Sequence, residues 1–220
     1  MNFVIIFFGW IFSLCLHEFS HALVAYYGGD TTVKEKGYLT FNPLKYTHPF
    51  LSIILPLLIL LMGGIGLPGG AVYIETWRIR NRYWLSSMSL AGPAANGVFA
   101  IFLAILLQVL PASTSNLWPG LSFLLVLQIW AILFNLIPLP GLDGYGVIGP
   151  FLSPAIQMQM ERMRAYAIWI LIIALWYIPF VGGFFRLIVQ LISILLLRVD
   201  WNLAEQGKNF LLGFFTGILR

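Results

Sequence analysis

The chain has 220 residues, of which 60% are hydrophobic and only 9% are Asp, Glu, Lys or Arg. A soluble domain usually carries about a quarter of charged residues, so this composition excludes an ordinary soluble protein and predicts an integral membrane protein. The net charge of +4 comes from few and scattered basic residues, which does not indicate nucleic-acid binding, and the single cysteine excludes an internal disulfide.

The first predicted elements are a span, a strand and a broken apolar segment. A membrane-spanning helix needs about 20 apolar residues, and residues 3–26 provide them. They lack a basic start and a small-residue cleavage site, so we interpret them as a retained span rather than a cleaved signal peptide. Residues 31–41 partly alternate in polarity and begin with β-branched residues, which predicts a strand. Residues 48–66 are apolar, but Pro56 interrupts them.

The rest of the chain is predicted to be mainly helical. Its predicted elements are a short strand at 71–75, helices at about 84–110, 121–136, 164–178 and 181–198, and an interfacial helix in the tail. No repeat, low-complexity tract or linker divides the chain. We therefore predict one membrane-embedded domain over 1–220. Its fold class is an all-α polytopic membrane protein with about five to six transmembrane helices and a small β element near the cytoplasmic side of the active site.

One polar motif lies inside the first span. His17 and His21 are four residues apart in HEFSH, so a helix presents both imidazoles on one face, with Glu18 about 100° around the axis. HExxH on a helix is the pattern of two zinc ligands and a general base, and a catalytic zinc ion takes three protein ligands and a water. The motif predicts a zinc site, with a polar network between helices or an ion path as the alternatives.

The third ligand must come from another part of the chain. Asp143 lies in LPGLDGYG, an otherwise apolar stretch that forms turns. Together with Glu18 it would neutralise a zinc dication, so the cluster could exist in a medium of low dielectric constant. The other acids lie in polar connections or beside basic residues: Asp30, Glu35, Glu75, Glu161, Asp200 and Glu205.

Three segments together resemble the site-2 protease family of intramembrane zinc metalloproteases. They are HEFSH (17–21), AGPAAN (91–96) and NLIPLPGLDG (135–144), in this order and spacing. The resemblance covers a catalytic core of about residues 1–146, whereas the C-terminal helices, about 147–220, match only in being hydrophobic. Tyr145 departs from the family's pattern, in which a second glycine often follows LDG. The chain is similar to a minimal form that lacks an added soluble regulatory domain.

The resemblance also implies roles for single residues. The ligands that it implies for one zinc ion per chain are His17, His21 and Asp143. It implies that Glu18 is the general base. Asn96 and Asn135 fall on the family's asparagines, which hold the substrate backbone or the developing oxyanion. The alternative for each asparagine is a hydrogen bond between helices.

A shared zinc ion constrains the topology, because its ligands must lie at one depth. The spans at 3–26 and 121–136 must then run in the same direction and the helix at 84–110 in the opposite one, so residues 48–66 are predicted to be re-entrant. Nearly all Lys and Arg then fall on one face, which the positive-inside rule makes cytoplasmic. We expect a multi-pass protein of a prokaryotic plasma membrane, with its active site nearer the cytoplasmic face.

The predicted function is that of a zinc metalloendopeptidase that hydrolyses peptide bonds in or near transmembrane segments, as in regulated intramembrane proteolysis. The expected partners are transmembrane protein substrates, mainly single-pass ones, and the lipid bilayer. The strands predicted at 31–41 and 71–75 would pair with an unwound substrate by strand addition. The alternatives are a membrane transporter or ion-path protein that uses the same cluster, and a catalytically inactive relative that binds membrane proteins.

Overall fold

The computed structural model describes residues 1–45, 72–110 and 116–218, which form helices and turns without any β-strand. In chain order the elements are α1 (Asn2–Gly28), α2 (Thr32–Glu35), η1 (Pro43–Lys45), η3 (Thr76–Arg78), α4 (Arg82–Val109), α5 (Trp118–Asn135), α6 (Asp143–Ile148), η5 (Gly149–Phe151), α7 (Pro154–Tyr177), α8 (Pro179–Leu191), the π-helical turn η6 (Ile192–Leu196) and α9 (Trp201–Ile218).

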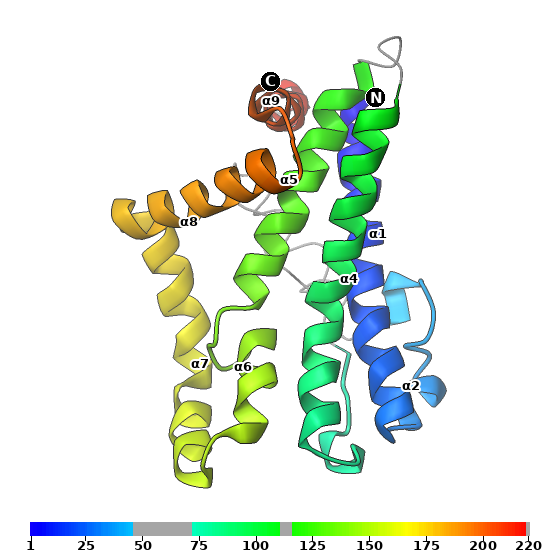
Figure 1. The fold of residues 1–220 in the computed structure, drawn as a ribbon, viewed down its shortest axis with the longest axis vertical. Helices are drawn as coiled ribbons and strands as arrows, with labels where there is room; N and C mark the ends of the chain where they lie inside the picture. Colours follow the sequence, from blue (N-terminus) through cyan, green and yellow to red (C-terminus); the bar gives the residue numbers. More distant parts are fainter. Residues whose placement is uncertain (46–71, 111–115, 219–220) are drawn as a thin grey trace.

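Three long helices, α1, α4 and α5, pack side by side along the long axis of the molecule (Figure 1). As predicted, α1 and α5 run in the same direction and α4 runs in the opposite one. α7 also follows the long axis, α8 lies across the upper half of the view, and α9 is seen end-on above it. α5 is the most buried of the long helices, because α1, α4 and α9 all pack against it.

Local sequence signals set the ends of the helices that carry the site. α1 ends at Gly28 because Gly29 adopts a φ of 126°, and a methyl group there would lie 2.6 Å from the carbonyl oxygen of Arg78. Asn81 caps α4, since its side-chain oxygen accepts hydrogen bonds at 3.0 and 3.1 Å from two backbone N–H groups of the first turn. The two helix ends meet where the Arg80 N–H donates to the Gly28 carbonyl at 2.9 Å.

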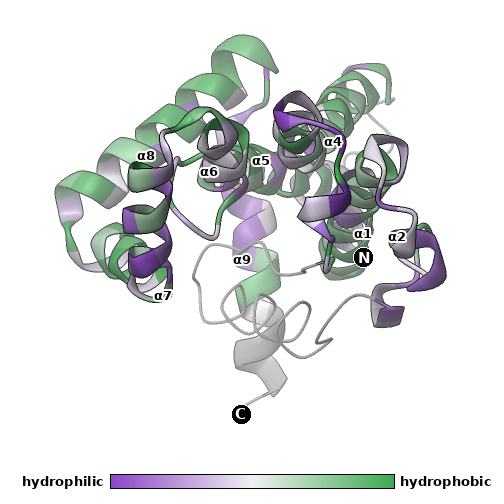
Figure 2. Cartoon of the chain, turned by 90° about the horizontal axis from the view of Figure 1, so that it is seen from below, coloured by the Kyte–Doolittle hydropathy of each residue, from purple (hydrophilic) through white to green (hydrophobic). Residues whose placement is uncertain are grey.

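The apolar helices identify an integral membrane protein. Figure 2 shows that hydrophobic residues dominate the long helices, and many large apolar side chains of α4, α7 and α8 are exposed. The described helices that are long and apolar enough to cross a membrane are Asn2–Gly28, Arg82–Val109, Trp118–Asn135 and Pro179–Leu196. The predicted count of five to six spans is not confirmed among them. α7 is not one of the four, and it carries Glu161, Arg162 and Arg164.

The last predicted helices are present with different bounds. α7 begins at Pro154 instead of about residue 164, because Ser153-Pro154 provides a helix start in which proline occupies the first turn. α8 begins at Pro179 and continues through the π-helical turn to Leu196, close to the predicted range of 181–198.

The strand predicted at 31–41 is wrong, because Thr32–Glu35 is the helix α2 and turns follow it. Asp30 decides the local conformation. Its Oδ1 accepts hydrogen bonds from the backbone N–H of Thr32 at 3.1 Å and from the Thr32 hydroxyl at 2.6 Å, a local bond that favours a turn over a strand. Val33 is fully buried against α1. The β-branched residues therefore form a helical turn that packs on α1.

The second predicted strand is not confirmed either. Ala71 lies outside the described residues, and residues 72–75 have no strand partner among the described ones. The N–H of Val72 donates to Oε2 of Glu18 at 3.1 Å, and that of Glu75 donates to Oδ2 of Asp30 at 2.7 Å. The carboxylates of Glu18 and Asp30 thus accept from two backbone N–H groups that a strand would use to pair with a neighbouring strand. The hypothesis of strand addition to a substrate loses its structural basis.

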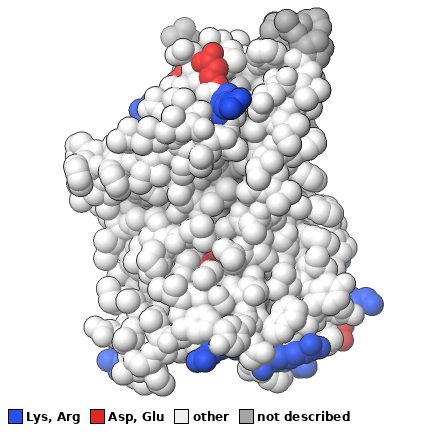
Figure 3. Space-filling view, in the orientation of Figure 1, with Lys and Arg blue, Asp and Glu red and all other residues white. Residues whose placement is uncertain are grey.

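Charged residues mark the end of the molecule at which α1 ends and α4 begins. The Glu75 carboxylate lies 2.6 Å from Nε of Arg78 and 3.0 Å from Nζ of Lys36, and these two cations hold its pKa below the ordinary value. Figure 3 shows most of the visible Lys and Arg at this lower end, a broad and mostly uncharged region above it, and a smaller group of charged residues at the upper end, so the basic residues do not all lie on one face. The segment 48–66, predicted to be re-entrant, lies outside the described residues.

Replacing Asp30 with alanine is expected to lower the free energy of unfolding by about 1–3 kcal/mol, the cost of leaving buried donors without partners. Asp30 is fully buried and accepts three hydrogen bonds. Unfolding in detergent, followed by circular dichroism, measures the change. Glu35→Ala, which removes an exposed acid from α2, is the matched control and should change stability by less than about 0.5 kcal/mol. Equal losses in both variants would contradict this role of Asp30.

Candidate metal centre

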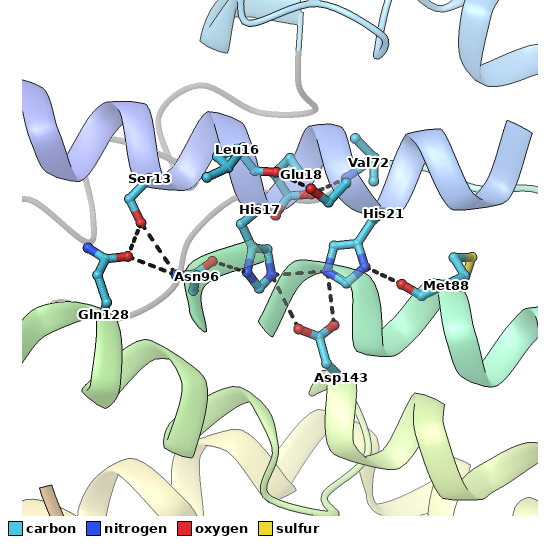
Figure 4. A network of polar contacts seen from close by, with 11 residues as sticks. Ser13, Leu16, His17, Glu18, His21, Val72, Met88, Asn96, Gln128 and Asp143 are labelled. Carbon is cyan, nitrogen blue, oxygen red and sulfur yellow. Dashed lines mark hydrogen bonds and ion pairs between the residues drawn. The ribbon is translucent and has the colours of Figure 1, made fainter. Parts of the chain in front are cut away.

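The imidazoles of His17 and His21 lie one helical turn apart on the buried face of α1 (Figure 4). Each residue is only 6% exposed, and the two Nε2 atoms are 3.0 Å apart. The helix therefore delivers two nitrogen atoms to one point, which is what the spacing of HEFSH requires.

Asp143 reaches the same point from the first position of α6. Its Oδ2 lies 3.2 Å from Nε2 of His17, and its Oδ1 lies 3.3 Å from Nε2 of His21. The following glycine makes this approach possible, because a methyl group on Gly144 would lie 2.6 Å from the carbonyl oxygen of Ile137. α6 can therefore begin directly against the loop that leaves α5.

Each imidazole is oriented by an oxygen on its far side. Nδ1 of His17 lies 3.0 Å from Oδ1 of Asn96, and Nδ1 of His21 lies 2.7 Å from the carbonyl oxygen of Met88. A carbonyl oxygen only accepts hydrogen bonds, so both Nδ1 atoms donate. Both Nε2 atoms then present lone pairs to each other and to the carboxylate, the tautomer that a metal-binding histidine needs.

The geometry fits a tetrahedral zinc ion. With bonds of about 2.0–2.2 Å to nitrogen and oxygen, neighbouring ligand atoms of such an ion lie roughly 3.3–3.5 Å apart. The ligand atoms of His17, His21 and Asp143 all lie within 4.8 Å of one another, and the individual distances are 3.0–3.3 Å. Buried Oδ2 of Asp143 accepts no hydrogen bond from the described residues. Two lone pairs and a carboxylate that face one another repel unless a cation lies between them.

Glu18 lies next to this cluster on α1 and is also buried. Its Oε2 accepts the hydrogen bond from the Val72 N–H, which comes from the chain segment before α4 (Figure 4). One carboxylate oxygen is thereby held in place by the backbone. The structure thus anchors the predicted general base at the side of the two imidazoles.

Gly92 is a site residue to which the sequence assigned no role. It faces the imidazoles from α4, and a methyl group in its place would lie 2.6 Å from Nε2 of His17 and closer still to Nε2 of His21. The available signal was a glycine in the middle of a helix, where it costs stability relative to alanine and so suggests a close approach. The absence of a side chain here is what leaves room for the metal centre.

The two predicted asparagines have different surroundings. Asn96 is buried, and its amide group bonds to His17 on one side and to Ser13 and Gln128 on the other, at 3.3 and 3.2 Å. Asn135 is buried at the end of α5, and its Nδ2 has no hydrogen-bond partner among the described residues. Asn96 is therefore engaged within the protein, whereas Asn135 retains a donor.

Two buried histidines and a partly buried carboxylate among membrane-length helices match the fold and site of an intramembrane zinc metalloprotease, since catalytic zinc is commonly held by two His and one acid. Comparisons with known proteins agree. The chain is 46% identical over 192 residues to "Putative zinc metalloprotease Rip2" of Mycolicibacterium smegmatis, covering 83% of this chain and 73% of the relative. The protein of the same name from Mycobacterium tuberculosis is 42% identical over 184 residues, covering 83% and 70%.

A more distant relative extends the match over nearly the whole chain. "Putative zinc metalloprotease YwhC" of Bacillus subtilis is 30% identical over 222 residues, which covers 96% of this chain and 90% of the relative. No family model and no solved structure matches the chain. The chain belongs to the site-2 protease family of zinc metalloproteases, and zinc is the metal that this membership and the donor set imply.

Proposed function

We propose that this protein hydrolyses peptide bonds in or near transmembrane segments of membrane proteins, with its chemistry at the cluster of His17, His21, Asp143 and Glu18. The observation that carries the proposal is the convergence of three metal-ligating side chains from α1 and α6 inside a bundle of membrane-length helices. His17, His21 and Asp143 would hold one zinc ion per chain. When bound there, zinc acts as a Lewis acid that polarises the scissile carbonyl group and lowers the pKa of a water.

The protein side chains supply proton transfer and orientation. Glu18 takes the proton of the attacking water and passes it to the leaving amine, while the Val72 N–H holds one of its oxygens. Asn135 has a buried donor without a partner among the described residues, and we assign it to the substrate carbonyl or the developing oxyanion. Asn96 is assigned to the orientation of His17, because that is where its oxygen bonds; the substrate contact predicted for Asn96 stays a prediction.

The same proposal includes the arrangement in the membrane. The domain comprises residues 1–220, with the ligands in the catalytic core at 1–146 and the C-terminal helices at 147–220, and its helices cross the membrane several times. His21 lies seven residues before the end of α1, which is about 10 Å at 1.5 Å per residue. That end of the bundle carries the gathered Lys and Arg (Figure 3). By the positive-inside rule, this charge distribution supports a site nearer the cytoplasmic face of a prokaryotic plasma membrane.

The substrates are proposed to be single-pass membrane proteins. A peptide bond in a transmembrane helix has its carbonyl group in an internal hydrogen bond, so the substrate must unwind locally before it can react. A single span can leave its bilayer position and unwind without breaking contacts to other spans of its own protein. That physical advantage supports single-pass substrates.

The test is zinc content together with cleavage of a model transmembrane substrate in proteoliposomes. Wild-type protein should contain zinc and cleave the substrate, a chelator should stop cleavage, and added zinc should restore it. Asp143→Asn should lose both zinc and cleavage, because a neutral amide oxygen is a poor replacement for a carboxylate ligand. The matched control is Asp200→Asn, which changes an exposed acid that accepts the Asn202 N–H at 2.9 Å. Active wild-type protein without zinc would overturn the proposal.

A further inference from the structure

Gln128 is a fully buried amide in the middle of α5, among apolar neighbours. Its Oε1 accepts hydrogen bonds from the Ser13 hydroxyl and, at 3.2 Å, from Nδ2 of Asn96. Its Nε2 donates to the carbonyl oxygen of Leu124 at 3.2 Å. A polar group at this depth is costly unless it is hydrogen-bonded, and here both the oxygen and the nitrogen of the amide are bonded. Such a network could serve helix packing alone, but its bonds continue to the metal centre (Figure 4).

The direction of each bond in this network is determined by the one before it. The Leu124 carbonyl can only accept, so it faces the NH₂ of Gln128, and the Gln128 oxygen faces Asn96. Asn96 must then turn its NH₂ toward Gln128 and its oxygen toward His17, 3.0 Å from Nδ1. Nδ1 of His17 therefore donates, and Nε2 of the same ring carries the lone pair that faces His21 and Asp143.

We propose that Gln128 is a positioning residue that acts through Asn96, keeping His17 in the tautomer that binds metal through Nε2. The inference rests on the proposed function, because it assumes that His17 is a ligand. An Asn96 side chain that is not held could rotate by 180° and present its NH₂ to His17. Nδ1 would then have to accept, Nε2 would carry the proton, and the ring could not bind the metal by that atom. The orientation of the His17 ring on α1 is thus determined, through Asn96 on α4, by a residue of α5.

The first experiment compares two glutamines in the full-length protein purified in detergent. Zinc affinity is measured by competition with a chelator, and the visible spectrum of the cobalt-substituted protein reports the coordination geometry. Gln128→Met should weaken zinc binding by about 10–100-fold, the usual effect of removing an outer-shell partner, and should change the cobalt spectrum. The matched control is Gln108→Met in α4, since Gln108 also donates to the carbonyl four residues earlier, Ala104, at 3.2 Å. It should bind zinc as the wild type does.

Two further measurements separate positioning from packing. Gln128→Glu should restore most of the zinc affinity even if its melting temperature falls, because a carboxyl oxygen accepts from Asn96 in either protonation state. If Gln128 acts through Asn96, adding Gln128→Met to an Asn96→Ala protein should cause no further loss of zinc affinity. A packing role alone predicts a lower melting temperature with zinc affinity and cobalt spectrum unchanged.

Several results would overturn the proposal: wild-type zinc affinity in Gln128→Met, equal losses in Gln128→Met and Gln108→Met, no recovery in Gln128→Glu, or additive losses in the double variant. If Gln128→Met does not fold, Gln128→Asn takes its place with the same expectation, because its amide is one methylene shorter and cannot span the contact to Asn96. Failure of the proposed function is distinguishable, because it would appear as wild-type protein that binds no zinc.

Discussion

Replacing Gly92 with alanine is expected to abolish zinc binding and cleavage while leaving the helices folded. The added methyl group would lie 2.6 Å from Nε2 and from Cε1 of His17, and closer still to Nε2 of His21. Such contacts are shorter than real Cβ atoms show, so the imidazoles must turn away and their nitrogens can no longer converge. We expect a loss of zinc affinity of at least about 100-fold, the upper end of what an outer-shell change causes. Chelator competition and the cleavage assay measure it.

Gly97→Ala is the matched control, because Gly97 lies in the same helix. The nearest atom to its added methyl group would be Cδ1 of Ile132 at 3.9 Å, an ordinary contact. This variant should keep zinc and cleavage, and it should gain up to about 1 kcal/mol of stability, since alanine favours a helix over glycine. Normal zinc affinity in Gly92→Ala would contradict the geometry of the site. Circular dichroism of both variants shows whether helix content is retained.

Replacing Glu18 with glutamine is expected to leave zinc in the protein and to remove cleavage. The glutamine oxygen can still accept the Val72 N–H that Oε2 of Glu18 accepts at 3.1 Å, so the local structure should persist. An amide cannot take a proton from water, and general acid–base catalysis contributes about 10²–10⁴-fold to such reactions. Turnover of a model transmembrane substrate should fall by that factor, while metal analysis gives the wild-type zinc content.

The control for Glu18→Gln is Glu35→Gln, the same chemical change at an exposed position of α2. It should affect neither zinc nor turnover. Full turnover by Glu18→Gln would exclude Glu18 as the base and would leave the proton transfer to another group. Loss of zinc together with turnover would instead show that Glu18 holds the metal site together, which is a structural role.

The strand predicted at 31–41 is wrong, and the strand predicted at 71–75 is not confirmed, for a reason that lies outside the residues on which the two predictions rested. Thr31, Thr32 and Val33 have the composition of a strand, but the buried carboxylate of Asp30 bonds to Thr32 and to the backbone of Glu75. Glu75 is far away in the sequence, so no local pattern contains this bond. The same holds for Val72, whose N–H is taken by Glu18. Tertiary hydrogen bonds overrode the local propensity at both sites.

The sequence by itself determined the class of protein, the two histidines on one helical face and the single acid suited to join them. The class and the histidine face follow from composition and helical periodicity, which are properties of neighbouring residues, and Asp143 was selected because it is an acid in an otherwise apolar stretch. Only the tertiary structure decided how the site is held. The space left at Gly92, the carbonyl of Met88 behind His21 and the amides of Asn96 and Gln128 behind His17 come from helices other than α1. Their roles depend on distances across the bundle, and these exist only once the apolar helices have packed.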